Sequence, residues 1–121
     1  EIVLGLYFDL KKAFDTVDHN ILLYKLHNYG IRGTVFDWFK SYLCNRKQFV
    51  SLSGINSDIN NIDCGIPQGS VLGLLLFLLY VNDIYKAVPD TTIKLFADDT
   101  NLFLSGKDPN EVNVKDNQYI L

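Results

Sequence analysis

The chain has 121 residues, a formal net charge of −3, and 48% hydrophobic and 21% charged residues. This profile excludes a disordered tail, a collagen-like repeat and a disulfide scaffold, and the length predicts one domain with a buried core. The acidic balance argues against a freestanding nucleic-acid-binding module, and two isolated cysteines indicate no zinc site. Because the sequence opens at Glu1 and contains no Met, we expect a fragment of a longer protein or a processed chain.

The first third of the chain predicts one strand and two helices. Residues 2–9 are apolar and β-prone, which is typical of a buried strand. Asp18 is a suitable N-cap for a helix over 19–29, and Gly30 is a suitable stop. Apolar spacing predicts a second helix over 34–44. The expected buried faces are Leu22, Leu26 and Tyr29 in the first helix and Val35, Phe36, Phe39 and Leu43 in the second.

The middle of the chain predicts a hairpin, a loop and an apolar helix. Residues 47–53 and 59–64 are expected to pair around a Gly-Ile-Asn-Ser turn. The Gly and Pro content of 65–69 predicts a loop, after which Ser70 can cap a helix that runs to about Ala87. Its apolar part, VLGLLLFLLYV, is shorter than a bilayer span, so we expect a buried helix and no membrane segment.

The last third of the chain predicts a second hairpin and a further helix. Residues 92–97 and 100–104 are expected to be strands that flank Asp98-Asp99 as a tight two-residue turn. The segment 108–111 reads Asp-Pro-Asn-Glu, which supplies an N-cap, a Pro in the first turn and a capping Glu. This order of elements predicts an α+β fold with antiparallel pairing rather than alternating βαβ units.

Three acidic residues lie where the predicted fold leaves them unpaired. Asp9 ends the first strand, and Asp98 and Asp99 lie at the tip of the last hairpin. Adjacent carboxylates repel each other, and a bound cation would offset that repulsion. Mg²⁺ prefers carboxylate oxygens, and two such ions can clamp the oxygens of an in-line phosphoryl displacement. Asp is also common in turns and at strand ends, so a plain structural role stays open.

Three segments carry a resemblance to a known family. They read LYFDLKKAFDTVDH at 6–19, CGIPQGSVLGLLLFLLYVND at 64–83 and LFADDTNLFL at 95–104. In this order and spacing they resemble the three palm motifs of reverse transcriptases, particularly those of non-LTR, LINE-type, jockey-like retrotransposons. The resemblance implies a polymerase palm-type antiparallel sheet packed on helices. It also implies that residues 1–121 are a partial reverse transcriptase domain without most of the fingers and thumb.

The resemblance further implies the catalytic and metal-binding residues. Asp9, Asp98 and Asp99 would be the catalytic acids and would bind two Mg²⁺ ions, which Mn²⁺ could replace. The backbone carbonyl of Leu10 would be a further metal ligand. In this interpretation Asp98 bridges both metals with Asp9, and Asp99 has a looser, supporting place.

A second group of residues is implied to contact nucleotide or template. These are Phe14, Pro67, Gln68, Gly69, Phe96 and Ala97. Phe14 matches the steric-gate position, where an aromatic ring disfavours a ribose 2′-hydroxyl; an ordinary core aromatic is the alternative. The loop 65–69 could equally be a plain entry to the helix that follows. Asp15 and Asp18 match the first motif and are interpreted as structural or capping acids.

The implied activity is RNA-directed DNA polymerisation, in which a dNTP is joined to the 3′-hydroxyl of a DNA primer on an RNA template. We expect the isolated fragment to be inactive and the parent enzyme to act inside the cell, in the nucleus. One alternative is a decayed or repurposed retroelement fragment that serves as a non-catalytic nucleic-acid or protein interaction module. Another is a response-regulator-like phosphoacceptor domain, which would place its acid pair near the first strand.

Two adjacent basic pairs complete the candidate residues. Lys11-Lys12 follows Asp9 closely, and Arg46-Lys47 lies at the start of the predicted middle hairpin. Either pair could contact nucleic-acid phosphates. A solvated surface pair is the alternative for Arg46-Lys47, and an ion pair with Asp15 is the alternative for one of the first two lysines.

Overall fold

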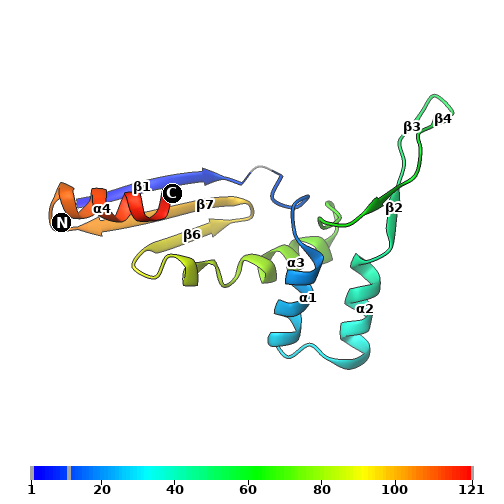
Figure 1. The fold of residues 1–121 in the computed structure, drawn as a ribbon, viewed down its shortest axis with the longest axis horizontal. Coiled ribbons are helices and arrows are strands. Elements are labelled where there is room, and N and C mark those ends of the chain that lie inside the picture. Colours follow the sequence, from blue (N-terminus) through cyan, green and yellow to red (C-terminus); the bar gives the residue numbers. More distant parts are fainter. Residues whose placement is uncertain (1, 11, 121) are drawn as a thin grey trace. The chain divides into compact units, whose positions relative to one another are not determined.

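The computed structural model describes residues 2–10 and 12–120, and the chain divides into two compact units (Figure 1). One unit comprises Glu1–Lys11 and Val81–Leu121, and the other comprises Lys12–Tyr80. The helices and strands in chain order are β1 (Ile2–Asp9), α1 (His19–Asn28), α2 (Gly33–Leu43), β2 (Arg46–Gln48), β3 (Ser51–Leu52), β4 (Ile55–Asn56), β5 (Asn60–Ile62), α3 (Val71–Val81), the 3₁₀ helix η1 (Ile84–Ala87), β6 (Thr92–Phe96), β7 (Asp99–Gly106) and α4 (Pro109–Ile120).

The unit that contains both ends of the chain is an antiparallel sheet covered by a helix. β7 lies between β1 and β6 and runs antiparallel to both. Helix α4 packs against β7 and β1 (Figure 1), and Leu102, Leu104 and Val112 are buried there. A Cβ at Gly106 would come within 2.7 Å of Val112 Cγ2, so the absence of a side chain lets helix and strand approach.

Strand β7 presents different chemistry on its two sides. Side chains alternate along a strand, and burial follows this alternation: Thr100, Leu102 and Leu104 are buried. These residues face α4. The alternate residues of β7, which include Asp99 and Asn101, therefore point to the opposite side, which we call the open face of the sheet.

The unit of residues 12–80 is built around three helices. The Asp18 carboxylate caps α1 by accepting hydrogen bonds from the N–H of Asn20 at 2.8 Å and of Ile21 at 3.0 Å, as the sequence predicts. Helices α1 and α2 lie side by side (Figure 1). Lys25 Nζ donates to the carbonyl of Tyr80 at 2.6 Å, which ties α1 to the end of α3. The fully buried side chains of this unit are Val17, Leu22, Leu26, Leu43, Leu76 and Phe77.

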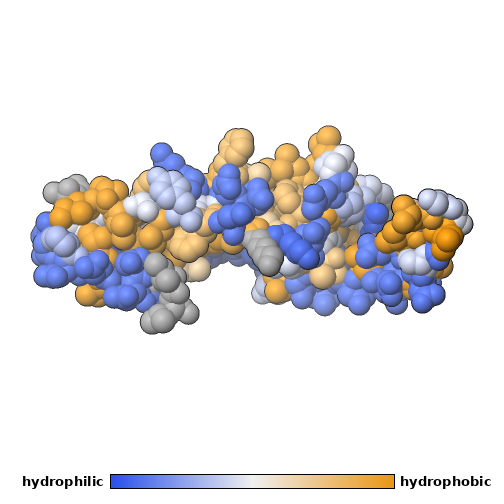
Figure 2. Space-filling view, turned by 90° about the horizontal axis from the view of Figure 1, so that it is seen from above, coloured by the Kyte–Doolittle hydropathy of each residue, from blue (hydrophilic) through white to orange (hydrophobic). Residues whose placement is uncertain are grey.

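A β-ribbon connects α2 to the loop before α3. β2 pairs with β5 and β3 pairs with β4, both antiparallel. The predicted hairpin is therefore present, but as two short ladders. Its turn is Ser53-Gly54 and not Gly-Ile-Asn-Ser, because these two residues adopt the positive φ values of +50° and +82° that a tight hairpin turn favours. The ribbon tip is apolar and exposed (Figure 2), with Leu52 74% and Ile55 76% exposed.

Several expectations about the helices were wrong. The helix expected to run to Ala87 ends at Val81, and η1 follows after Asn82 and Asp83. Its expected burial applies to Gly73, Leu76 and Phe77 only, because one face of a helix packs while the rest needs other partners. The residues expected to be buried but found exposed are Tyr29, Val35, Val71, Leu74, Leu75 and Leu78.

The predicted α+β class is confirmed for the described residues. Their strand pairings are antiparallel, and the order of helices and strands does not follow regular βαβ alternation. Nowhere in residues 2–10 and 12–120 is a helix both long enough and apolar enough to cross a bilayer.

Candidate functional site

Two of the three predicted catalytic acids lie opposite each other in the sheet. Asp9, the last residue of β1, pairs with Asp99, the first residue of β7. Directly paired residues in an antiparallel ladder project from the same face, so both carboxylates belong to the open face. Both residues are exposed, and Leu10 follows immediately and is 37% exposed. The sheet register therefore brings together acids that are 90 residues apart in the sequence.

The third acid, Asp98, lies in the turn that joins β6 to β7. The predicted tip was Asp98-Asp99, whereas β6 ends at Phe96 and β7 begins at Asp99, so the turn residues are Ala97 and Asp98. Ala97 has a φ of +52°, a conformation that glycine adopts more readily than alanine. The strained backbone position of this turn is therefore Ala97, next to the acid pair.

The open face around the acids carries aromatic and polar side chains. Phe96 pairs with Asp99 from the β6 side and is 79% exposed, and Tyr7 is 75% exposed. The rings of Tyr7 and Phe103 meet edge to face at 6.3 Å, and Lys94 Nζ lies 5.8 Å from the centre of the Phe103 ring. Exposed rings beside a cation suit contact with nucleotide bases and phosphates.

The donor set of this face suits a divalent metal ion only in part. Across residues 2–10 and 12–120, no group of three or more Asp, Glu, His or Cys side chains is arranged to hold a metal ion. Mg²⁺ is usually held by one or two carboxylates together with waters and substrate phosphates, not by an all-protein cage. The facing pair Asp9 and Asp99, with Asp98 adjacent, supplies carboxylates of that kind.

Four of the predicted nucleotide-contacting residues line one pocket in the unit of residues 12–80. Phe14, Pro67, Gln68 and Gly69 surround an open pocket of 310 Å³ together with Ser70 and Leu74. The Phe14 ring stacks on Phe77 with 4.4 Å between ring centres. Phe14 is therefore both a packing residue, as the alternative interpretation held, and a wall of the pocket.

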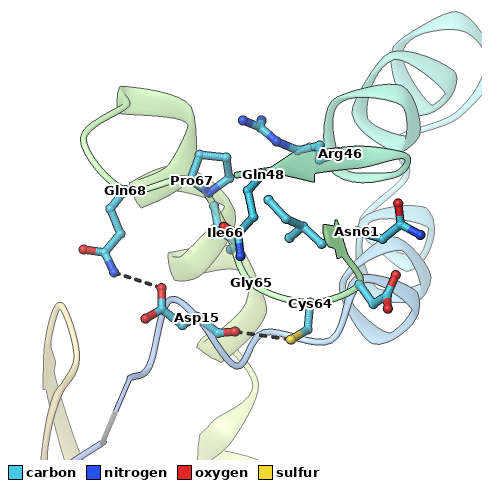
Figure 3. Close-up of a pocket in the computed structure, with 11 residues that line it drawn as sticks. Asp15, Arg46, Gln48, Asn61, Cys64, Gly65, Ile66, Pro67 and Gln68 are labelled. Carbon is cyan, nitrogen blue, oxygen red and sulfur yellow. Dashed lines mark hydrogen bonds between the residues drawn. The ribbon is translucent and has the colours of Figure 1, made fainter. Parts of the chain in front are cut away.

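A larger pocket of 610 Å³ lies along the same loop (Figure 3). Gln68 and Asp15 border it on one side, and Arg46 and Gln48 of β2 border it on the other. Gln68 Nε2 donates a hydrogen bond to Asp15 Oδ1 at 3.1 Å. The lining residues include an arginine, two acids and three amides beside apolar groups.

The loop 65–69 is fixed by hydrogen bonds to the second half of the first motif. The N–H of Gly65 donates to the carbonyl of Val17 at 2.7 Å, and the N–H of Ile66 donates to the carbonyl of Phe14 at 2.7 Å. The buried side chain of His19 places Nε2 2.7 Å from the Gly65 carbonyl oxygen. Ser70 then caps α3 by accepting from the N–H of Gly73 at 2.9 Å. Phe14 and the loop are thus held as one piece.

The basic pairs have different environments. Arg46 is half-buried, lines the larger pocket and lies with its guanidinium carbon 5.5 Å from the centre of the Tyr42 ring. Lys47 and Lys12 are exposed. Lys11 lies outside the described residues.

Comparison with known proteins identifies the family. A sequence model described as reverse transcriptase (RNA-dependent DNA polymerase) matches residues 3–119. The chain belongs to the reverse transcriptase family. This confirms the resemblance carried by the three motifs, and the matched residues include every position predicted for the site.

Individual relatives of this reverse transcriptase segment come from mobile elements of Drosophila. The RNA-directed DNA polymerase from mobile element jockey of Drosophila melanogaster is 35% identical over 114 residues, which are 88% of this chain and 12% of the relative. The probable RNA-directed DNA polymerase from transposon X-element of the same species is 37% identical over 101 residues, which are 78% of this chain and 11% of the relative. The RNA-directed DNA polymerase from mobile element jockey of Drosophila funebris is 34% identical over 100 residues, which are 77% of this chain and 11% of the relative. The chain thus spans 11–12% of the length of these curated relatives.

Sequence reasoning on this reverse transcriptase segment missed the contacts of two residues near the pockets. Asp15 was interpreted as a structural acid, yet its carboxylate accepts a hydrogen bond from Gln68. His19 was given no role, yet its Nε2 lies 2.7 Å from the carbonyl oxygen of Gly65. The position of both residues in the first motif was the available signal, but their partners lie 53 and 46 residues away.

Proposed function

We propose that this chain is the palm segment of an RNA-directed DNA polymerase from a non-LTR retrotransposon. The polymerase would join dNTPs to the 3′-hydroxyl of a DNA primer on an RNA template, and would act in the nucleus. The single observation that carries the proposal is the register that sets Asp9 opposite Asp99, beside the Ala97-Asp98 turn, in a chain of the reverse transcriptase family.

The acids of the open face would bind two divalent ions, Mg²⁺ or Mn²⁺. Asp9, Asp98 and the carbonyl of Leu10 would be ligands, and Asp99 would support them. When bound, such ions supply Lewis-acid activation and offset the charge that develops on the phosphoryl group. The contribution of the chain is to anchor these acids at one end of a sheet whose other face is buried under α4, so that little reorganisation is needed during reaction.

The pocket beside Phe14 would receive the sugar of the incoming nucleotide. Phe14 is held by stacking on Phe77 and by the hydrogen bond from the N–H of Ile66 to its carbonyl. A ring that is stacked on a buried neighbour and attached to a hydrogen-bonded backbone cannot move aside easily for a 2′-hydroxyl. Gln68, in the same pocket wall, would hydrogen-bond the nucleotide or the template strand. Phe96 and Ala97 would contact the primer end from the open face.

The test is primer extension by a full-length polymerase that contains this sequence. Asp9→Asn and Asp98→Asn should each lower kcat by about a thousandfold or more, because an amide loses the charge that the ions require. Removal of the divalent ion with a chelator should abolish extension, and Mg²⁺ or Mn²⁺ should restore it.

A matched control separates this role from a general charge effect. Asp37 is an exposed acid of α2, and Asp37→Asn removes the same charge without touching the open face of the sheet. This variant should extend primers at the rate of the unsubstituted enzyme. Full activity in Asp98→Asn would overturn the proposed function.

A further inference from the structure

We propose that Asp15 and His19 are positioning residues that set the loop 65–69, and with it the nucleotide pocket, through two side-chain hydrogen bonds. The inference rests on the proposed function and adds to it residues that contact neither metal nor nucleotide. Both residues belong to the first motif, His19 as the first residue of α1, and both have partners in the loop.

The geometry of His19 fixes its protonation at one nitrogen. Its Nε2 lies 2.7 Å from the carbonyl oxygen of Gly65, and a carbonyl oxygen can only accept, so Nε2 carries the proton and donates. The residue is 6% exposed. Removal of the donor would leave a poorly hydrated carbonyl unpaired at the first residue of the loop.

The geometry of Asp15 fixes the orientation of Gln68 in a similar way. A carboxylate only accepts hydrogen bonds, so the amide nitrogen of Gln68 must face Asp15 at 3.1 Å, as Figure 3 shows. The carbonyl oxygen Oε1 of the amide is then directed away from Asp15 (Figure 3). Asp15 therefore determines which end of the Gln68 amide is offered to a ligand.

The need for these two bonds follows from the backbone of the loop. Gly65 and Ile66 donate their N–H groups to Val17 and Phe14, but the ladder cannot continue because Pro67 has no N–H. Gln68 lies between this proline and the helix cap at Ser70. Its bond to Asp15 attaches the far part of the loop, while the His19 bond attaches the near part.

The same attachments reach the steric-gate candidate. Phe14 accepts a hydrogen bond from Ile66 and shares a pocket wall with Gln68. A shift of the loop would therefore change the distance between the Phe14 ring and the loop, which is the space left for the sugar. We infer that Asp15 and His19 act on dNTP affinity and on the choice between deoxyribonucleotides and ribonucleotides.

The experiment uses a full-length polymerase that contains this sequence, with steady-state KM and kcat for dNTP and for the matching ribonucleotide. His19→Leu should raise KM for dNTP about tenfold and lower the preference for dNTP by a similar factor, the effect of one unpaired, partly buried group. Asp15→Leu should change both quantities in the same direction by a smaller factor, because its bond to Gln68 is exposed to solvent. Asp15→Asn and His19→Gln retain an acceptor and a donor of similar reach, and both should restore KM to near the original value.

Matched controls remove the same side-chain types elsewhere. Asp37→Leu replaces an exposed acid of α2, and His27→Leu replaces an exposed histidine of α1; both should leave KM and sugar preference unchanged. KM and the preference ratio do not depend on how much enzyme is folded. A loss of kcat with an unchanged KM and preference in Asp15→Leu and His19→Leu would therefore overturn the inference and assign both residues to folding alone.

The assay also separates this inference from the proposed function. Suppose that the unsubstituted enzyme extends primers, that Asp98→Asn abolishes extension, and that KM is unchanged in Asp15→Leu and His19→Leu. This result would sustain the proposed function and reject the positioning role. Absence of extension by the unsubstituted enzyme would reject both.

Discussion

Gly65 brings two backbone segments into contact within the unit of residues 12–80. Its φ is +88°, and a Cβ at this position would lie 2.8 Å from the carbonyl oxygen of Asp15. Two different physical requirements therefore select glycine here: the left-handed backbone conformation and the absence of a side chain. The ribbon offers a comparison, because Gly54 has a φ of +82° with no atom within 4 Å of its Cβ position.

Gly65→Ala should destabilise the chain more than Gly54→Ala. Both changes force alanine into the left-handed region, which costs about 1–2 kcal/mol, but only the first also pushes a methyl group against backbone. The free energies of unfolding from urea titrations measure the difference. Equal losses in the two variants would show that the loop 65–69 yields to the added atom.

Among single residues, the acidic group could be predicted from the sequence, but a contact between distant loops could not. Asp9, Asp98 and Asp99 were predicted as a group because acids at a strand end and a hairpin tip are unusual without a cation, and the register does pair Asp9 with Asp99. The bond between Asp15 and Gln68 was not predicted, because it depends on how two loops 53 residues apart fold against each other. No local pattern carries that information.

Helix α4 begins with a capping arrangement that was predicted from four residues. Asp108 Oδ1 accepts from the N–H of Glu111 at 3.0 Å, and Glu111 Oε2 accepts from the N–H of Lys107 at 2.9 Å. Glu111 also pairs with Lys115 at 3.1 Å. The N–H of Lys107 and then the ammonium of Lys115 hold the pKa of Glu111 below its ordinary value of 4.5, because both favour the charged carboxylate.

Acid should loosen the start of α4 through Glu111. Because the folded-state pKa is lowered, this stabilisation is fully present above pH 4.5 and is lost as the pH falls through the lowered value. Hydrogen-exchange protection of the Lys107 amide, corrected for intrinsic exchange, should fall over that range. In Glu111→Gln the protection should be weaker at neutral pH and should change little on acidification; an unchanged acid response in that variant would assign the effect to another group.

Elements with local signals were predicted well, and elements defined by tertiary contacts were not. Asp18 and the Asp-Pro-Asn-Glu segment mark the starts of α1 and α4 through hydrogen bonds within one turn. Helix α3 ends at Val81, several residues before its expected end. The last hairpin turns at Ala97-Asp98, one residue before the expected turn. The pairing of Phe96 with Asp99 sets the turn, and such a shift of register by one residue is not visible in the local sequence.

At the scale of the whole molecule, the charge balance limits what this chain can do alone. Its 11 basic residues are outnumbered by 14 acidic ones, whereas grip on a duplex requires lysines and arginines that neutralise phosphates. In the proposed polymerase, that grip and the binding of the triphosphate would come from parts of the protein outside these 121 residues.

The 121-residue chain by itself should therefore not extend a primer. It should also bind an RNA–DNA primer–template weakly at physiological salt, with a shallow dependence of affinity on salt concentration. Primer extension and a salt titration of binding by fluorescence anisotropy would measure both properties. Tight binding with a steep salt slope would contradict this expectation, as would extension that Asp98→Asn abolishes.

The alternation of β7 has a consequence for how such a sequence can decay. In the observed register of β7, Leu102 and Leu104 are buried under α4 and Asp99 lies on the opposite side. Insertion or deletion of a single residue in the strand would exchange the two sets and ruin packing and chemistry together. A point substitution of Asp9 or Asp99 leaves the packing untouched. Among copies of this sequence that have lost activity but still fold, the inactivating changes should therefore be substitutions of acids, and length changes within β1 and β7 should be confined to copies that no longer fold.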